Sequence, residues 1–116
     1  MILSYEREFG SAIRRHRVVQ AGCATREEFC EKHGASLGGL TEEMLKDIEK
    51  GNLLGGFEMS HMVNLINLFW PDNGERVAML SLAYKVEARM DEERAKTPID
   101  ARSITPAVSQ EASALA

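Results

Sequence analysis

The chain has 116 residues, of which 44% are hydrophobic and 28% are charged, and its formal net charge is −4. This length allows one ordinary domain, and the composition is that of a soluble globular protein. The acidic balance, with a pI of about 5.4, argues mildly against a protein whose whole surface is built for nucleic acid. Phosphate contacts need Lys and Arg, but the local charge decides more than the sum does.

No apolar run has the length that a bilayer requires, and "MILS" is too short for a signal peptide. Two cysteines, Cys23 and Cys30, predict a reducing compartment and therefore a cytoplasmic protein. On one helix they would be about 10 Å apart along the axis, which is too far for a disulfide. A zinc site with His33 is conceivable, but the spacing fits no zinc pattern and a fourth ligand is missing. We therefore expect no metal and no cofactor.

No segment alternates between apolar and polar residues, so every ordered segment is predicted to be helical. Residues 4–20 form the first predicted helix, with Phe9 and Ile13 on its inner face. The opposite face is basic and carries Arg14, Arg15 and Arg17.

Two short helices are predicted next, and each has signals at both ends. Thr25 is the expected N-cap of residues 25–33, and Gly34 is the expected C′ glycine. Thr41 is the expected N-cap of residues 41–50, which end at "GN".

A fourth helix is predicted over residues 57–69, and Pro71 stops it. A long helix follows over about residues 74–95. The last part of the chain is rich in Ser, Ala and Pro and is predicted to be a disordered tail, with a docked peptide as the alternative. The predicted organisation is therefore a domain over 1–70, a long helix over 71–95 and a tail over 96–116.

A short helix, a glycine-containing turn and a second short helix have the helix-turn-helix layout. The chain resembles the lambda-repressor-like helix-turn-helix proteins, also called the Cro/repressor or XRE class, over about residues 5–70. The matching residues are Phe9, Ile13, Arg17, Thr25, Phe29, Cys30, Gly34, Leu40, Thr41, Leu45, Ile48, Glu49, Gly51, Val63, Ile66 and Phe69.

This resemblance implies a compact five-helix, all-α domain with a long C-terminal helix. Residues 25–33 would be the supporting helix, and residues 41–50 would be the recognition helix in the major groove of double-stranded DNA. It also implies a sequence-specific, repressor-like transcription regulator that works as a homodimer on a two-fold operator. A buried pair between Arg17 and Glu49 is implied as well.

The chain departs from the family pattern in three ways. Cys30 stands where the family usually has Ala, and His16 stands where it often has Leu. The "ASLGG" turn is longer than the usual tight turn, so we expect the two helices to cross differently. The face that would meet DNA carries three acids, Glu42, Glu43 and Asp47.

The resemblance implies two sets of DNA contacts. The residues expected to read bases are Thr41, Glu42, Glu43, Lys46 and Asp47. The residues expected to hold phosphates are Arg26, Lys50 and Asn52, with a further contribution from Arg14 and Arg15. A carboxylate can accept a hydrogen bond from cytosine, but three carboxylates near phosphates are repulsive. The alternative is a repurposed helix-turn-helix that binds protein, such as an antitoxin, an anti-repressor or an adaptor.

The long helix carries two apolar stripes, which is more than one domain needs. One stripe is Val77, Leu80 and Tyr84. The other has the spacing of a coiled-coil seam and is predicted to form the dimer contact: Met79, Ala83, Val86 and Met90. The alternative is that the helix only covers its own domain.

No enzyme chemistry is predicted. His16, His33 and His61 are scattered and fall into no catalytic spacing, and "GNLLGG" lacks the Lys-Ser/Thr ending of a phosphate loop.

Overall fold

The computed structural model describes residues 4–96. In this range five α-helices follow one another and no strand is present: α1 (Tyr5–Arg15), α2 (Arg26–His33), α3 (Glu42–Lys50), α4 (Met59–Phe69) and α5 (Asn73–Lys96). A π-helical turn, η1 (His16–Gln20), extends α1, and a 3-10 turn, η2 (Ala35–Leu37), follows α2. The predicted all-α class is confirmed for this range. The predicted tail lies outside the described residues, except for Lys96.

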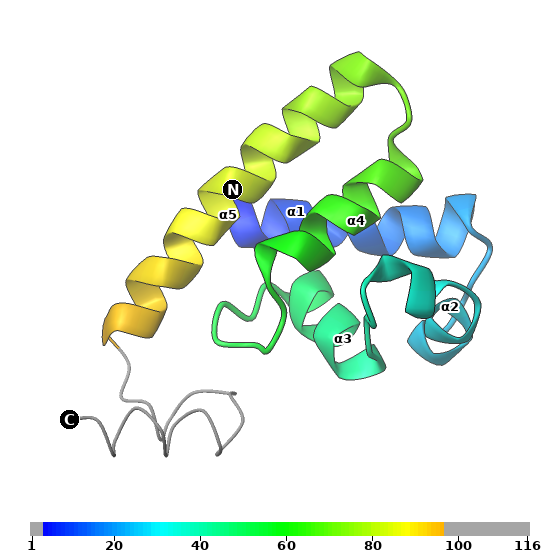
Figure 1. The fold of residues 1–116 in the computed structure, drawn as a ribbon, viewed down its shortest axis with the longest axis horizontal. Coiled ribbons are helices and arrows are strands. Elements are labelled where there is room, and N and C mark those ends of the chain that lie inside the picture. Colours follow the sequence, from blue (N-terminus) through cyan, green and yellow to red (C-terminus); the bar gives the residue numbers. More distant parts are fainter. Residues whose placement is uncertain (1–3, 97–116) are drawn as a thin grey trace.

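Helix α1 is the centre of the arrangement. It packs against α3 and against α5, while α4 packs against α5 and α2 packs against α3. Figure 1 shows α5 running along one side of the fold and the pair of α2 and α3 lying on the other. The apolar positions predicted from helical spacing meet between these helices, and the largest fully buried side chains include Phe9, Ile13, Phe29, Leu45, Ile48, Met62, Leu65, Ile66 and Val86.

Side-chain caps start the two short helices, as the sequence predicts. The Thr25 hydroxyl accepts a hydrogen bond from the Glu28 backbone N–H at 3.1 Å, and the Thr41 hydroxyl accepts one from the Met44 N–H at 3.1 Å. Each cap satisfies a backbone N–H that has no partner inside its helix. Helix α3 ends at Gly51, whose φ of 71° suits glycine and few other residues.

Gly34 does not play the part that its position suggests. It has a helical φ of −54°, and the chain continues into η2 before Gly38 takes up the left-handed conformation. A Cβ atom on Gly34 would lie 2.5 Å from the Cys30 carbonyl oxygen and 2.8 Å from the Leu40 carbonyl oxygen. Glycine is therefore required here by close backbone packing and not by a positive φ.

A second glycine lets α1 and α3 touch through their backbones. Gly10 is buried inside α1. A Cβ atom on it would collide with the Ile48 carbonyl oxygen and would lie 2.6 Å from the Glu49 carbonyl oxygen. This contact sets how α3 is held against the rest of the fold.

The two stripes of α5 are used in the reverse of the predicted way. Ala83, Val86 and Met90 are 0%, 1% and 2% exposed in the chain's own core, and Met79 packs against that core. The expected dimer seam therefore packs against the chain's own domain, because its side chains cover the apolar faces of α1 and α4. On the other stripe Leu80 is partly buried, whereas Val77 and Tyr84 are each 62% exposed.

Arg94 fastens the end of α5 to the loop between α3 and α4. Its guanidinium donates to the Gly55 carbonyl at 2.8 Å and to the Phe57 carbonyl at 3.1 Å. None of the described helices combines the length and the apolar character needed to cross a membrane.

Candidate functional site

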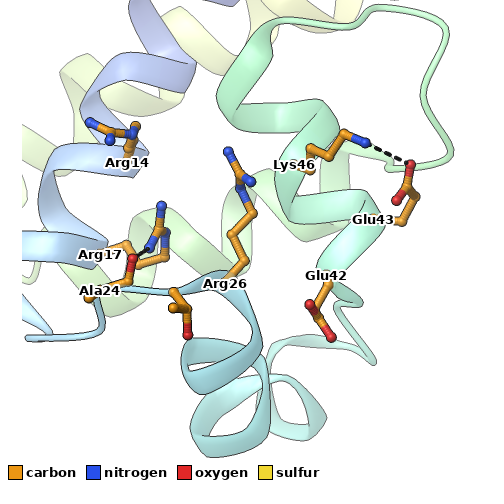
Figure 2. Close-up of a pocket in the computed structure, with 8 residues that line it drawn as sticks. Arg14, Arg17, Ala24, Arg26, Glu42, Glu43 and Lys46 are labelled. Carbon is orange, nitrogen blue, oxygen red and sulfur yellow. Dashed lines mark hydrogen bonds and ion pairs between the residues drawn. The ribbon is translucent and has the colours of Figure 1, made fainter.

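A polar hollow of about 400 Å³ lies where α1, the start of α2 and the start of α3 approach one another. Figure 2 shows Arg14 on α1, Arg26 at the start of α2, and Lys46 with two glutamates on α3. The hollow is lined by Arg14, Arg17, Ala24, Thr25, Arg26, Glu42, Glu43 and Lys46. Four of the eight residues expected to contact DNA line this hollow, namely Arg26, Glu42, Glu43 and Lys46. Thr41 precedes Glu42 as the N-cap of α3.

Behind the hollow lies the ion pair that the resemblance implies. The Arg17 Nε donates to Glu49 Oε2 at 2.7 Å, and an Arg17 Nη donates to Glu49 Oε1 at 3.0 Å. The hydrogen bond with Glu49 is the main reason that the pKa of Arg17 is raised above its usual value, against the opposing effect of burial. The predicted pair of Arg17 and Glu49 is confirmed.

Arg17 also binds the segment between η1 and α2, residues 21–25. Its second Nη donates to the Cys23 carbonyl at 2.9 Å and to the Ala24 carbonyl at 3.0 Å. The Cys23 N–H returns a hydrogen bond to the Arg17 carbonyl at 3.0 Å. One buried side chain therefore links η1, the segment before α2, and α3.

Arg26, an expected phosphate contact, shares the same carboxylate. Its Nε donates to Glu49 Oε1 at 3.1 Å, and its side chain remains 28% exposed. Figure 2 shows it extending into the space between α1 and α3. Glu49 thus positions the Arg26 head group, and its negative charge is compensated by two arginines.

The first turns of α3 present the acids to solvent. Thr41, Glu42 and Glu43 are exposed, and the Lys46 ammonium lies 3.6 Å from the Glu43 carboxylate. This pair spans i and i+3 on an exposed surface, where such pairs are weak. The Lys46 charge is therefore free to change partner at little cost.

Two expected contacts lie elsewhere. Asp47 is 8% exposed, and its Oδ1 accepts a hydrogen bond from the Asn52 side-chain amide at 3.1 Å. The Asp47 carboxylate packs so closely on Gly55 that a Cβ atom there would lie 2.6 Å from it. Asp47 therefore organises the loop after α3 and does not face the hollow. This is a correction to its expected role in reading bases.

A second polar hollow, of about 490 Å³, lies at the other end of α3. It is lined by Arg7, Ser11, Glu49 and Lys50. Lys50 was an expected phosphate contact, but Arg7 and Ser11 were missed. The signal for them is that Arg7, Ser11 and Arg14 follow the i, i+4, i+7 spacing of one helical face.

The histidines and cysteines serve the packing. His16 contacts the Trp70 ring at a centroid distance of 4.3 Å, and the His61 Nδ1 accepts a hydrogen bond from the Glu58 N–H at 3.0 Å as part of the cap of α4. Cys23 and Cys30 are free thiols. Between residues 4 and 96, no group of three or more His, Cys, Asp or Glu side chains is placed to hold a metal ion.

Cys30 is expected to make the free energy of unfolding depend on pH in the alkaline range. Burial, with the negative charges of Glu42 and Glu49 nearby, raises the pKa of its thiol above the ordinary value. The folded state therefore favours the protonated thiol. Its contribution to stability is complete below the ordinary thiol pKa of about 8.5 and is lost as the pH rises through the folded pKa.

We expect the melting temperature of the wild type to fall relative to that of Cys30→Ala as the pH is raised from about 7 to about 10. Thermal melts of both proteins across this range measure the difference, and other titrating groups cancel in the comparison. A constant difference between the two melting temperatures would contradict the prediction.

Comparisons of the chain with models of protein families, with curated proteins and with solved structures found no match.

Proposed function

We propose that this protein is a sequence-specific, repressor-like DNA-binding regulator of transcription, in which α2, its turn and α3 act as a helix-turn-helix. The observation that supports the proposal is the exposed start of α3 beside basic side chains from two other helices, Arg14 of α1 and Arg26 of α2. An α-helix with its side chains is about 10–12 Å across, which suits a major groove about 12 Å wide. Phosphates would bind Arg14, Arg26 and Lys50, and bases would meet Thr41, Glu42, Glu43 and Lys46.

Selection of bound fragments from a random pool of double-stranded DNA tests this function. At about 50 mM salt we expect enrichment of a shared sequence, and at about 200 mM salt we expect much weaker retention, because counterion release drives phosphate contacts. If no sequence is enriched at the lower salt concentration, the proposed function is excluded.

We further propose that the protein acts as a homodimer. The support is the outer face of α5, where Val77 and Tyr84 remain exposed after the other stripe has been used by the core. Light scattering should give about twice the monomer mass of 12.9 kDa, and the selected DNA should contain two-fold related half-sites. Val77→Ser with Tyr84→Ser should restore the monomer mass.

One observation favours a second candidate, a protein-binding module. Glu42 and Glu43 are exposed at the start of α3, and in a DNA groove their carboxylates would be repelled by the phosphates on either side. On this alternative, the acidic tip binds a basic surface of a partner protein, as in an antitoxin, an anti-repressor or an adaptor.

Glu42→Gln with Glu43→Gln separates the two candidates. If α3 enters DNA, we expect affinity for random DNA to rise on the order of fivefold per charge removed, since a unit charge at 4 Å in water contributes about 1 kcal/mol. Discrimination between the selected sequence and random DNA should fall. Glu31→Gln with Asp91→Asn removes the same charge from exposed positions on α2 and α5 and is the matched control. Equal DNA binding by both double variants, with loss of a co-purifying protein only from the first, would favour the protein-binding module.

A further inference from the structure

The hollow at the C-terminal end of α3 is lined by two basic side chains that have no acidic partner in the described part of the chain. Arg7 and Lys50 line it from α1 and α3, and Ser11 lies one turn from Arg7 on the same face of α1. It shares no lining residue with the hollow of Figure 2. It is therefore a separate place at which a ligand could be held.

Two glycines allow α1 and the end of α3 to approach closely beside this hollow. Gly10 allows the backbones of α1 and α3 to meet, as described above. Gly51 ends α3 directly beside Arg7, and a Cβ atom on Gly51 would lie 3.3 Å from Arg7 Cγ. The last turn of α3 and the first half of α1 are consequently held together, which brings the Lys50 and Arg7 side chains to the same hollow.

Among the described residues, Glu49 is the one acid that lines this hollow, and its charge is already compensated. Both carboxylate oxygens of Glu49 accept hydrogen bonds from Arg17 and Arg26, two arginines that line the first hollow and not this one. Glu49 therefore offers no uncompensated charge to Arg7 or to Lys50. Two cations facing one hollow repel each other, and an anion bound between them removes that cost.

These cations differ from most others in the described part of the chain. Lys32, Lys46, Arg89 and Lys96 each have an acidic partner within 4.0 Å. Between residues 4 and 96, Arg7 and Lys50 form neither an ion pair nor a side-chain hydrogen bond. An unpaired guanidinium, an unpaired ammonium and a hydroxyl are the donors that bind a phosphodiester.

We propose that Arg7, Ser11 and Lys50 form a second phosphate-binding site for the DNA backbone, distinct from the contacts of Arg14 and Arg26. This inference rests on the proposed function, and it deepens it by placing backbone contacts at both ends of α3. Such contacts fix the register of α3 on the duplex and carry no sequence information themselves.

The test measures affinity as a function of salt for the wild type, Arg7→Gln, Lys50→Gln and the double variant. The DNA is a sequence recovered by the selection and, in parallel, a random sequence. We expect the slope of log K against log salt to shrink by about 0.9 for each lost contact. Affinity for both DNAs should fall by the same factor, so their ratio stays constant. Ser11→Ala should weaken both without changing the slope, because it removes no charge.

Lys32→Gln is the matched control, because it removes one positive charge from an exposed position on α2 that lines neither hollow. Arg7→Lys with Lys50→Arg should keep the wild-type slope, which excludes a merely structural role for the two side chains. If the wild type binds DNA and the double glutamine variant keeps the slope of the Lys32→Gln control, this inference is overturned and the proposed function stands. A change in sequence preference would also overturn it, because the two residues would then read bases. If the wild type binds no DNA at all, the proposed function itself fails.

Discussion

Replacement of Glu49 by alanine is expected to lower the free energy of unfolding by about 3–5 kcal/mol, because removal of one partner of a buried ion pair leaves the other charge uncompensated. Arg17 would keep its two backbone carbonyl acceptors but would lose its carboxylate, and Arg26 would lose its only side-chain partner in the described range. For a domain of this size the melting temperature should fall by on the order of 15 °C.

Two further variants identify the cause. Glu49→Gln keeps the shape but removes the charge, and it should lose less than Glu49→Ala because one oxygen still accepts a hydrogen bond. Arg17→Met with Glu49→Leu removes both charges and should recover part of the loss of the alanine variant. Urea denaturation measures all three. A wild-type midpoint for Glu49→Ala would show that the pair does not organise the fold.

Gly10→Ala is the second large effect that we expect. Alanine favours a helix interior over glycine by about 1 kcal/mol, so a local argument predicts stabilisation. The structure predicts the opposite sign, because the new Cβ would collide with the backbone of α3 at Ile48 and Glu49. Backbone atoms cannot swing aside as a side chain can, and overpacking of this kind costs about 1–3 kcal/mol or more.

Gly74→Ala is the control for Gly10→Ala. Gly74 lies in the exposed first turn of α5, and a Cβ atom there meets only the Asp72 Oδ1, at 3.3 Å. This variant should be neutral or slightly stabilised in urea denaturation. Equal effects of the two substitutions would show that α1 and α3 do not approach as closely as the structure indicates.

Local patterns in the sequence predicted the helices well. Thr25 and Thr41 cap α2 and α3, and Gly51 ends α3, because each of these preferences depends on the chemistry of a few neighbouring residues. The inner positions of the helices also followed from a 3.6-residue period. The ion pair between Arg17 and Glu49 was implied by family resemblance and not by any local pattern.

Residue spacing along a helix does not determine which exposed or apolar face the rest of the fold covers, and here the tertiary structure decided it. Asp47 and Glu43 both belong to α3, yet only the loop at Gly55 determines that Asp47 is buried and Glu43 is exposed. Periodicity found both stripes of α5 but could not assign one to the core, because that depends on where α1 and α4 lie.

The candidate phosphate site shows the same division. The sequence by itself determined that Arg7, Ser11 and Arg14 share one face of a helix, since side-chain direction along a helix is a local property. Only the tertiary structure placed Lys50 beside Arg7, because that meeting depends on the backbone contact at Gly10 between segments far apart in the chain.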